Sequence, residues 1–187
     1  MALTKVVDGG TNFTNVASLT KLLDATISSS VANYDIDSTY INSTYDTYRL
    51  EFELIAATDG TYTNLNVFVG GSVQTGSIYG SEASPTDGGT TYNNNTTTGF
   101  NLQGYTVGNA DGEGITGIIE LKNVNSTTLP FHLMGYSVVH NSSGNHYGSA
   151  VTGSLRPANR GDVVNGLRLK FTSGNIESGR VKLYGIT

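Results

Sequence analysis

The chain has 187 residues, with 15 acidic and 10 basic side chains, a formal net charge of -5 and no cysteine. This length predicts one domain with a hydrophobic core of its own. The charge balance argues against a nucleic-acid partner, and the missing cysteine excludes disulfides, thiolate zinc sites and cysteine nucleophiles.

Small and hydroxylated residues dominate the composition, with 25 Thr, 24 Gly, 18 Ser and 18 Asn against 13% charged residues. Such a mixture favours strands and turns over helices. The first residues lack the apolar region of a secretory signal, and no later stretch approaches 18 apolar residues. We therefore expect an all-β chain that is made in a cytoplasm and is not inserted in a membrane.

Residues 1–24 form the first predicted segment. Val16, Leu19, Leu22 and Leu23 have helical spacing, but nine residues are too few for more than a short connector. A short helix and an irregular arm are equally favoured here. We interpret residues 1–24 as an N-terminal docking arm and residues 25–187 as a single β-sandwich domain.

The clearest strand is predicted at residues 48–55, where apolar and polar residues alternate. Leu50, Phe52 and Leu54 would face the core, and Glu51 and Glu53 the solvent. A turn at residues 58–60 and a second alternating run at residues 64–69 then predict a hairpin.

Further strands are predicted by the same alternation along the rest of the chain. They are residues 25–31, 73–79, 100–107, 115–124, 131–139, 147–155, 164–171 and 176–186. Ten strands of ordinary length suit a two-sheet jelly-roll sandwich. The polar, low-complexity residues 80–99 predict a long surface loop, and residues 108–114 and 140–146 predict shorter ones.

The search for reactive groups favours no enzyme and no cofactor. His140 and His146 flank a polar loop but match no established metal-ligand spacing, so we expect solvated histidines and no metal site. Turn chemistry explains Asp111 and Glu113 better than calcium binding does. Glu51 and Glu53 face the same way on one strand, which suits a solvated face better than a glycosidase acid pair.

Two segments carry a family resemblance. Residues 43–52 (STYDTYRLEF), followed by residues 57–60 (ATDG), resemble a hairpin of small virion proteins of tailed bacteriophages. Residues 171–186 (FTSGNIESGRVKLYGI) are similar to the closing hairpin of the same group. The resemblance implies a jelly-roll module on the exterior of the virion and implies no catalytic residue.

Together, the resemblance and the residues predict a non-enzymatic virion structural protein, made in the host bacterium. A tail-fibre or tail-associated head that takes part in host attachment is favoured, and a capsid decoration protein is the alternative. A carbohydrate-binding module or depolymerase fragment is the alternative of another class. The expected partners are further copies of the chain in a homotrimer, other virion proteins, and a host surface glycan or protein.

Two surfaces are predicted from the residues. The long loops are too polar for the core, so we expect them to form a recognition or docking surface. Its candidate residues are Tyr92, Asn94, Asn95, His140, His146 and Tyr147. On the last strand, Val181 and Leu183 would face the core, and the candidate subunit interface is Lys182, Tyr184 and Ile186.

Overall fold

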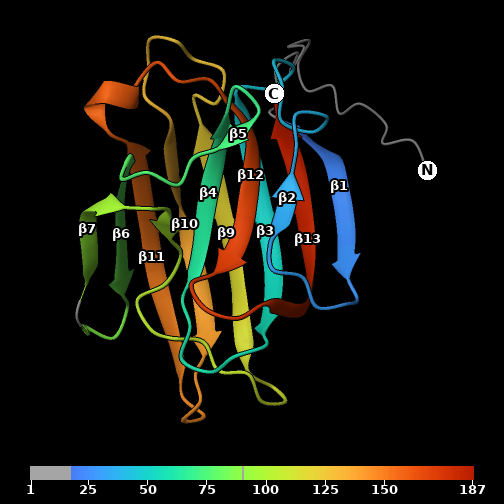
Figure 1. Cartoon of the computed structure of the whole chain (residues 1–187), viewed down its shortest axis with the longest axis vertical. Coiled ribbons are helices and arrows are strands. Elements are labelled where there is room, and N and C mark those ends of the chain that lie inside the picture. The colour runs from blue at the N-terminus through green and yellow to red at the C-terminus, as the bar shows by residue number, and fades with distance from the viewer. Residues whose placement is uncertain (1–17, 90) are drawn as a thin grey trace, which may run out of the picture.

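The computed structural model describes residues 18–89 and 91–187, although not the side chains of residues 92–97, and within them the chain forms two antiparallel sheets (Figure 1). The larger sheet has the order β1-β13-β3-β9-β10-β11-β6-β7, and the smaller has β2-β12-β4-β5, with β8 also paired to β4. The strands are β1 (Leu19–Ile27), β2 (Tyr34–Ile36), β3 (Thr47–Ala56), β4 (Thr63–Val69), β5 (Ser72–Val73), β6 (Tyr79–Pro85), β7 (Tyr92–Thr97), β8 (Phe100–Asn101), β9 (Gly114–Lys122), β10 (His132–His140), β11 (His146–Leu155), β12 (Val164–Phe171) and β13 (Ile176–Ile186). One 3-10 turn, Pro157–Asn159, precedes β12. Among the described residues, no helix has the length and apolar character to cross a membrane.

Eight of the strands follow the path of a jelly roll. The first pairs with the last (β1 with β13), the second with the second-last (β2 with β12) and the third with the third-last (β3 with β9). The two middle strands, β4 and β8, pair with each other. Successive pairs enter opposite sheets, as in an antiparallel ribbon wrapped around a core. The predicted all-β, two-sheet jelly-roll sandwich is confirmed.

Two insertions widen the large sheet beyond these eight strands. The hairpin β10–β11 is inserted between β9 and β12, and the hairpin β6–β7 between β4 and β8. β10 pairs with β9, and β6 pairs with β11, so the large sheet gains four strands on one side. The small sheet does not extend over them. Their inner face must therefore be covered in another way.

Residues 100–107 cross this inner face as a mostly irregular segment and close it. A buried serine on each of β6, β10 and β11 bonds to the backbone of this segment. The bonds join Ser81 to the N–H of Asn101 (2.9 Å), Ser137 to the C=O of Leu102 (2.6 Å) and Ser149 to the N–H of Gly104 (2.9 Å). Phe100 packs directly on β11, where a Cβ on Gly153 would lie 2.5 Å from its ring.

The core between the sheets follows the predicted alternation. Leu50, Phe52 and Leu54 of β3 are buried, whereas Glu53 and Ile55 are exposed. On β13, Val181 and Leu183 are buried as predicted. The period-2 pattern therefore fixes the inward and outward faces of both strands.

Four local predictions are wrong. Residues 19–24 belong to the strand β1, not to a helix or an arm, because Leu23 and Ala25 pair with the buried Leu183 and Val181. Residues 1–17 lie outside the described residues, so docking by that part of the arm stays a prediction.

Two of the wrong predictions concern hairpins. β3 and β4 lie in opposite sheets and form no hairpin, and the same holds for β12 and β13. Only the ends of residues 73–79 and 100–107 are in strands.

Residues 80–99, predicted as a long surface loop, are mainly the hairpin β6–β7. Ser81, Ala83 and Pro85 of β6 are buried although the segment has few large apolar residues. Small side chains are sufficient here because residues 100–107 approach the strand closely. The prediction failed because a polar composition does not exclude a buried strand of small residues.

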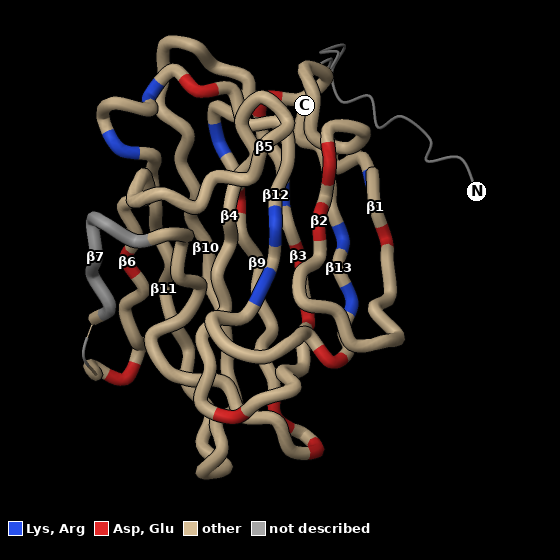
Figure 2. The backbone as a smooth tube through the Cα atoms, in the orientation of Figure 1, with Lys and Arg blue, Asp and Glu red and all other residues tan. Residues whose placement is uncertain are grey.

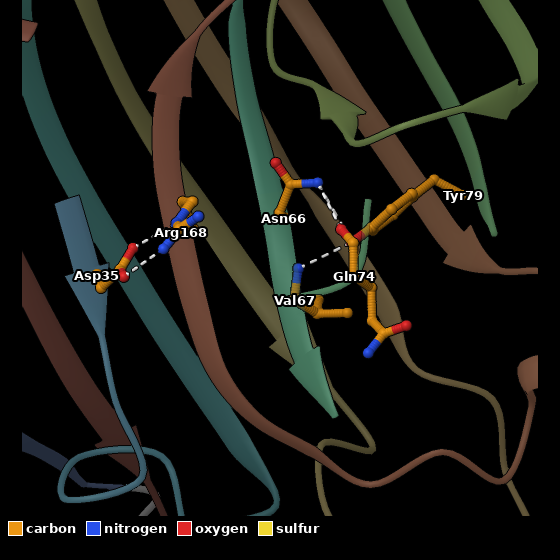
Figure 3. A network of polar contacts seen from close by, with 6 residues as sticks. All are labelled: Asp35, Asn66, Val67, Gln74, Tyr79 and Arg168. Carbon is orange, nitrogen blue, oxygen red and sulfur yellow. Dashed lines mark hydrogen bonds and ion pairs between the residues drawn. The ribbon is translucent and has the colours of Figure 1, made fainter. Parts of the chain in front are cut away.

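Tyr79 ties the two sheets together (Figure 3). The edge of β4 that faces away from β12 pairs with β8 at Leu65 and with β5 at Phe68. Between these two short strands, the N–H of Val67 is left as a gap in the backbone pairing. The hydroxyl of the buried Tyr79, at the start of β6, fills that gap. It accepts a hydrogen bond from the N–H of Val67 (3.1 Å) and donates one to the C=O of Gln74 (2.7 Å). A side chain of the large sheet thereby completes the backbone pairing of the small one.

Replacing Tyr79 by Phe should cost about 1–3 kcal/mol of stability, because the buried N–H of Val67 and C=O of Gln74 each lose a partner. The control is Ser142→Ala, which removes the hydroxyl of an exposed side chain and should change stability by about 0.5 kcal/mol or less. Urea unfolding of both variants measures the difference. Equal losses of stability in the two variants would show that the Tyr79 hydroxyl does not hold the two sheets together.

The same hydroxyl should make stability fall at alkaline pH. Burial raises the pKa of Tyr79 above its ordinary value, because the phenolate is disfavoured away from water. An unfolded tyrosine ionises near pH 10, before the folded one, so this contribution is complete below about pH 10 and is lost as the pH rises further. Urea unfolding between pH 8 and pH 11 should show a shallower loss for Tyr79→Phe than for the wild type. Parallel losses would contradict the assignment.

Candidate functional site

The outer face of the large sheet is the most distinctive surface of the described residues. We define it by the side chains of β1, β13, β3, β9, β10, β11 and β6 that point away from the small sheet. Four surface hollows are lined by residues of these strands and of the turns beside them. This face has two halves of opposite character.

The half formed by β1, β13 and β3 is charged, and its charges are neutralised within the sheet. Lys182 lies between Asp24 and Glu51 in the register, and Arg180 lies opposite Glu53. Asp24 accepts hydrogen bonds from Lys21 (3.0 Å) and Arg180 (2.9 Å), which lower the pKa of its carboxyl. Opposite charges on neighbouring strands stabilise such a face in water, so this half needs no partner.

The half formed by β9, β10 and β11 is apolar around its centre, and its charges are the ion pair of Glu120 and Lys122 (3.1 Å) towards one end of β9. Neither β10 nor β11 contains a Lys, Arg, Asp or Glu, and both are free of red and blue in Figure 2. The side chains of Ile118, Met134, Tyr136 and Val138 are exposed by 41%, 47%, 70% and 45%. Tyr136 stands between Ile118 and Ala150 in the register. We call these four residues the β10 patch.

The β10 patch lies where the polarity of β10 is inverted, in the middle of the strand between the buried Leu133 and Val139. Its inward positions include Gly135 and Ser137, while its outward positions carry Met134, Tyr136 and Val138. Ser137 faces inward because its hydroxyl bonds to the segment that closes the core. The three outward side chains beside it, Met134, Tyr136 and Val138, face the solvent although all three are large and apolar.

A groove runs beside the protruding ring of Tyr136. Its volume is about 570 Å³, and its walls are mainly apolar. The small side chains Ala150 and Thr152 of β11 line one side, and Arg49 and Glu120, which are paired in the register, line the other. The groove is large enough to accept bulky side chains of another molecule.

A second candidate surface lies at the end of the sandwich where residues 57–60, 108–113 and 141–145 form turns. These turns are bonded to one another, from the N–H of Asn109 to Asp59 (3.0 Å) and from the N–H of Gly108 to the C=O of His140 (3.0 Å). We call this region the turn end. It contains part of the predicted recognition surface.

The predicted recognition residues do not form one cluster. His140 and His146 are exposed, directly opposite each other in the β10–β11 register, with ring centroids 5.9 Å apart. Tyr147 points inward and stacks on Tyr105 at 3.8 Å. Tyr92, Asn94 and Asn95 belong to the edge strand β7, in which Tyr92 pairs with Ala83 and Asn94 with Ser81. Their side chains lie outside the described residues.

The candidate interface residues Lys182, Tyr184 and Ile186 lie together on β13, half-buried on the outer face. Tyr184 lies opposite Arg49 of β3, and Lys182 lies opposite Glu51. They therefore belong to the charged half, two strands or more from the β10 patch. Sequence reasoning missed the patch itself. In residues 131–139, apolar residues occupy both the odd-numbered and the even-numbered positions. One of these two sets must face away from the core, and this pattern was the signal for the patch.

In the described part of the chain, no group of three or more His, Asp or Glu side chains is placed to hold a metal ion. No protein-family model matches the chain, and no curated protein or solved structure matches it.

Tyr147 should prove to be a packing residue rather than a recognition residue. Tyr147→Ala should cost about 1–3 kcal/mol, because it removes a stacked pair and part of the apolar surface packed against the core. His146→Ala, next in the chain and exposed, should change stability by about 0.5 kcal/mol or less. Thermal unfolding compares the two variants. A small effect of Tyr147→Ala would return this residue to the recognition surface.

Proposed function

We propose that this protein is a non-enzymatic structural component of the exterior of a bacteriophage particle. The observation that carries the proposal is the exposed apolar half of the outer face, centred on Tyr136. Exposed contiguous patches of this kind mark contacts with other proteins. A protein built into a particle needs such contacts.

The resemblance to tailed-phage virion proteins supports the particle as the setting. Its two segments are far apart in the chain but adjacent in the fold, because β3 and β13 pair along most of their lengths. The turns beside these strands also meet, where the N–H of Ala57 bonds to the C=O of Asn175 (2.9 Å). Gly174, in the turn before β13, has φ +72°, a left-handed conformation that glycine adopts readily. The shared residues thus build one structural unit, which suits a scaffold better than a reactive site.

Within the particle, a tail-fibre or tail-associated head that takes part in host attachment is our first candidate. The turn end, with His140 and His146 exposed at the tip of the β10–β11 hairpin, would face a host glycan or protein. A capsid decoration protein is the alternative, for which the outer face would be the docking surface. In either case the chain would assemble with its own copies, and a homotrimer is the number that the resemblance favours.

A carbohydrate-binding module is the candidate of another class. The exposed ring of Tyr136 beside a groove favours it, since sugar rings stack on aromatic side chains. The largely apolar walls of the groove argue against it, because sugar hydroxyls need hydrogen-bond partners. We therefore place it second.

Cryo-electron microscopy of intact particles tests the proposal. We expect density for this sandwich on the exterior, either at the tail or on the capsid. Particles that carry the chain at neither position, or a chain that is absent from purified particles, would contradict the virion assignment.

A double variant, His140→Ser with His146→Ser, separates the two virion positions. Both side chains are exposed, so folding should be unchanged. For a tail-fibre head, adsorption to host cells should fall several-fold. For a decoration protein, adsorption should be normal, and replacement of Tyr136 by Ser should instead lower occupancy on the capsid. The control is Leu129→Ser, an exposed apolar residue outside both surfaces, which should leave adsorption and occupancy unchanged.

A further inference from the structure

We propose that the outer face of the large sheet binds the same face of a second copy of this chain, with the β10 patches of the two copies in contact around a two-fold axis. This goes beyond the proposed function, because it names the partner of the face and the symmetry of the contact, and it can be tested on the purified chain.

The distribution of exposed apolar side chains favours self-pairing. Of seven large apolar side chains that are exposed among the described residues, six lie on the outer face: Leu19, Ile55, Ile118, Met134, Tyr136 and Val138. Leu19 lies at the far edge of this face, on β1, and the seventh, Leu129, lies in a loop. A head-to-tail contact needs two different complementary surfaces, whereas a two-fold contact needs one surface that fits itself. The described residues offer one apolar surface.

The charges of the outer face also favour a second copy. Ten charged residues occupy paired, outward positions on the large sheet, and five are basic and five acidic. They are Lys21, Arg49, Lys122, Arg180 and Lys182 against Asp24, Glu51, Glu53, Glu82 and Glu120. The paired positions are therefore neutral, and the exposed Glu177 at the bulge of β13 adds one negative charge, whereas the whole chain carries -5. Two copies that approach through this face avoid most of the net repulsion that opposes their approach elsewhere.

The size of the face matches that of a stable dimer contact. From β13 to β6 it spans six strands, and its central strands, β9 and β10, have nine residues. Strand spacing and rise make this roughly 24 Å by 30 Å, or about 700 Å². Standard interfaces bury about 800 Å² on each partner. The apolar half would form the centre of this contact, and the paired charges its rim.

The shape of the face provides a knob and a hollow side by side. Tyr136 protrudes from β10, and the groove beside it is lined by Ala150 and Thr152 of the neighbouring β11. Rotation by 180° about an axis close to Tyr136 brings the ring of each copy over the groove of the other. The contact would be a stack of two sheets, as between the layers of a sandwich. A separate three-fold contact would convert such dimers into hexamers without changing this face.

The first test measures the mass of the full-length chain by light scattering over a range of micromolar concentrations. We expect twice the 19.7 kDa of one chain, or six times that mass if a three-fold contact is also present. Tyr136→Ser should weaken the two-fold contact at least about tenfold in dissociation constant, since buried aromatic anchors dominate interface energies. Leu129→Ser is the matched control and should leave the mass unchanged. Circular dichroism and melting verify that both variants fold.

The second test uses the absence of cysteine in the chain. Thr152→Cys and Ala150→Cys each introduce a single thiol on the face without removing Tyr136, and Leu129→Cys introduces one outside it. Stacked sheets lie about 10 Å apart, which is too far for a direct disulfide between facing residues. A bismaleimide reagent that spans roughly 10 Å should therefore link at least one of the two face variants to its own mate rapidly and leave Leu129→Cys unlinked.

A wild-type monomer or trimer, a mass unaffected by Tyr136→Ser, or equal cross-linking of all three cysteine variants would each overturn the proposal. None of these results depends on where the protein resides. A dimer that is absent from phage particles would overturn the proposed function and leave the two-fold contact intact.

Discussion

The two sheets of this sandwich have unequal widths, and the structure depends on how the excess of the wider sheet is closed. A jelly roll of eight strands covers its own core, but β10, β11, β6 and β7 extend the large sheet past the edge of the small one. Residues 100–107 and the side chain of Tyr79 fill that space. Because a buried irregular segment needs partners for its backbone, the inward positions of the added strands include three serines that bond to it. The hydroxyl of Tyr79 does the same for the N–H of Val67 in the small sheet.

This way of closing the core determines the character of the outer face. On the jelly-roll strands β3 and β13, large apolar residues point inward and charged ones outward, so their outer side is stable in water. On β10 the two central inward positions, between the buried Leu133 and Val139, are Gly135 and Ser137, which suit the crossing segment. The outward positions carry Met134, Tyr136 and Val138, where a sheet face in water usually carries polar side chains. The apolar half of the outer face is thus the counterpart of a polar closure inside.

The sequence predicted those parts of the fold that depend on one strand and its two faces. Alternation at residues 48–55 identified which residues of β3 are buried, and strand number indicated two sheets. It did not predict that β3 and β4 lie in opposite sheets, because a tight turn and a crossover between sheets can have the same residues and length. Tyr79 stands at the end of a predicted strand, although its role is set by Val67 of the other sheet and by Gln74, which follows β5. Likewise, the β10 patch could not be assigned to the surface before the partner of Ser137 was known.

The inverted polarity of β10 bears on function as well as on folding. A strand in the middle of a sheet is paired along both edges, so its inverted polarity exposes side chains and not backbone, and the usual risk of strands adding to a free edge does not arise. What remains is a flat apolar surface of fixed shape on a rigid support, which costs little side-chain or loop entropy to bury. A loop would supply contacts only after being ordered. The inserted hairpin therefore equips a jelly roll with a preorganised contact surface, while the eight original strands maintain the fold.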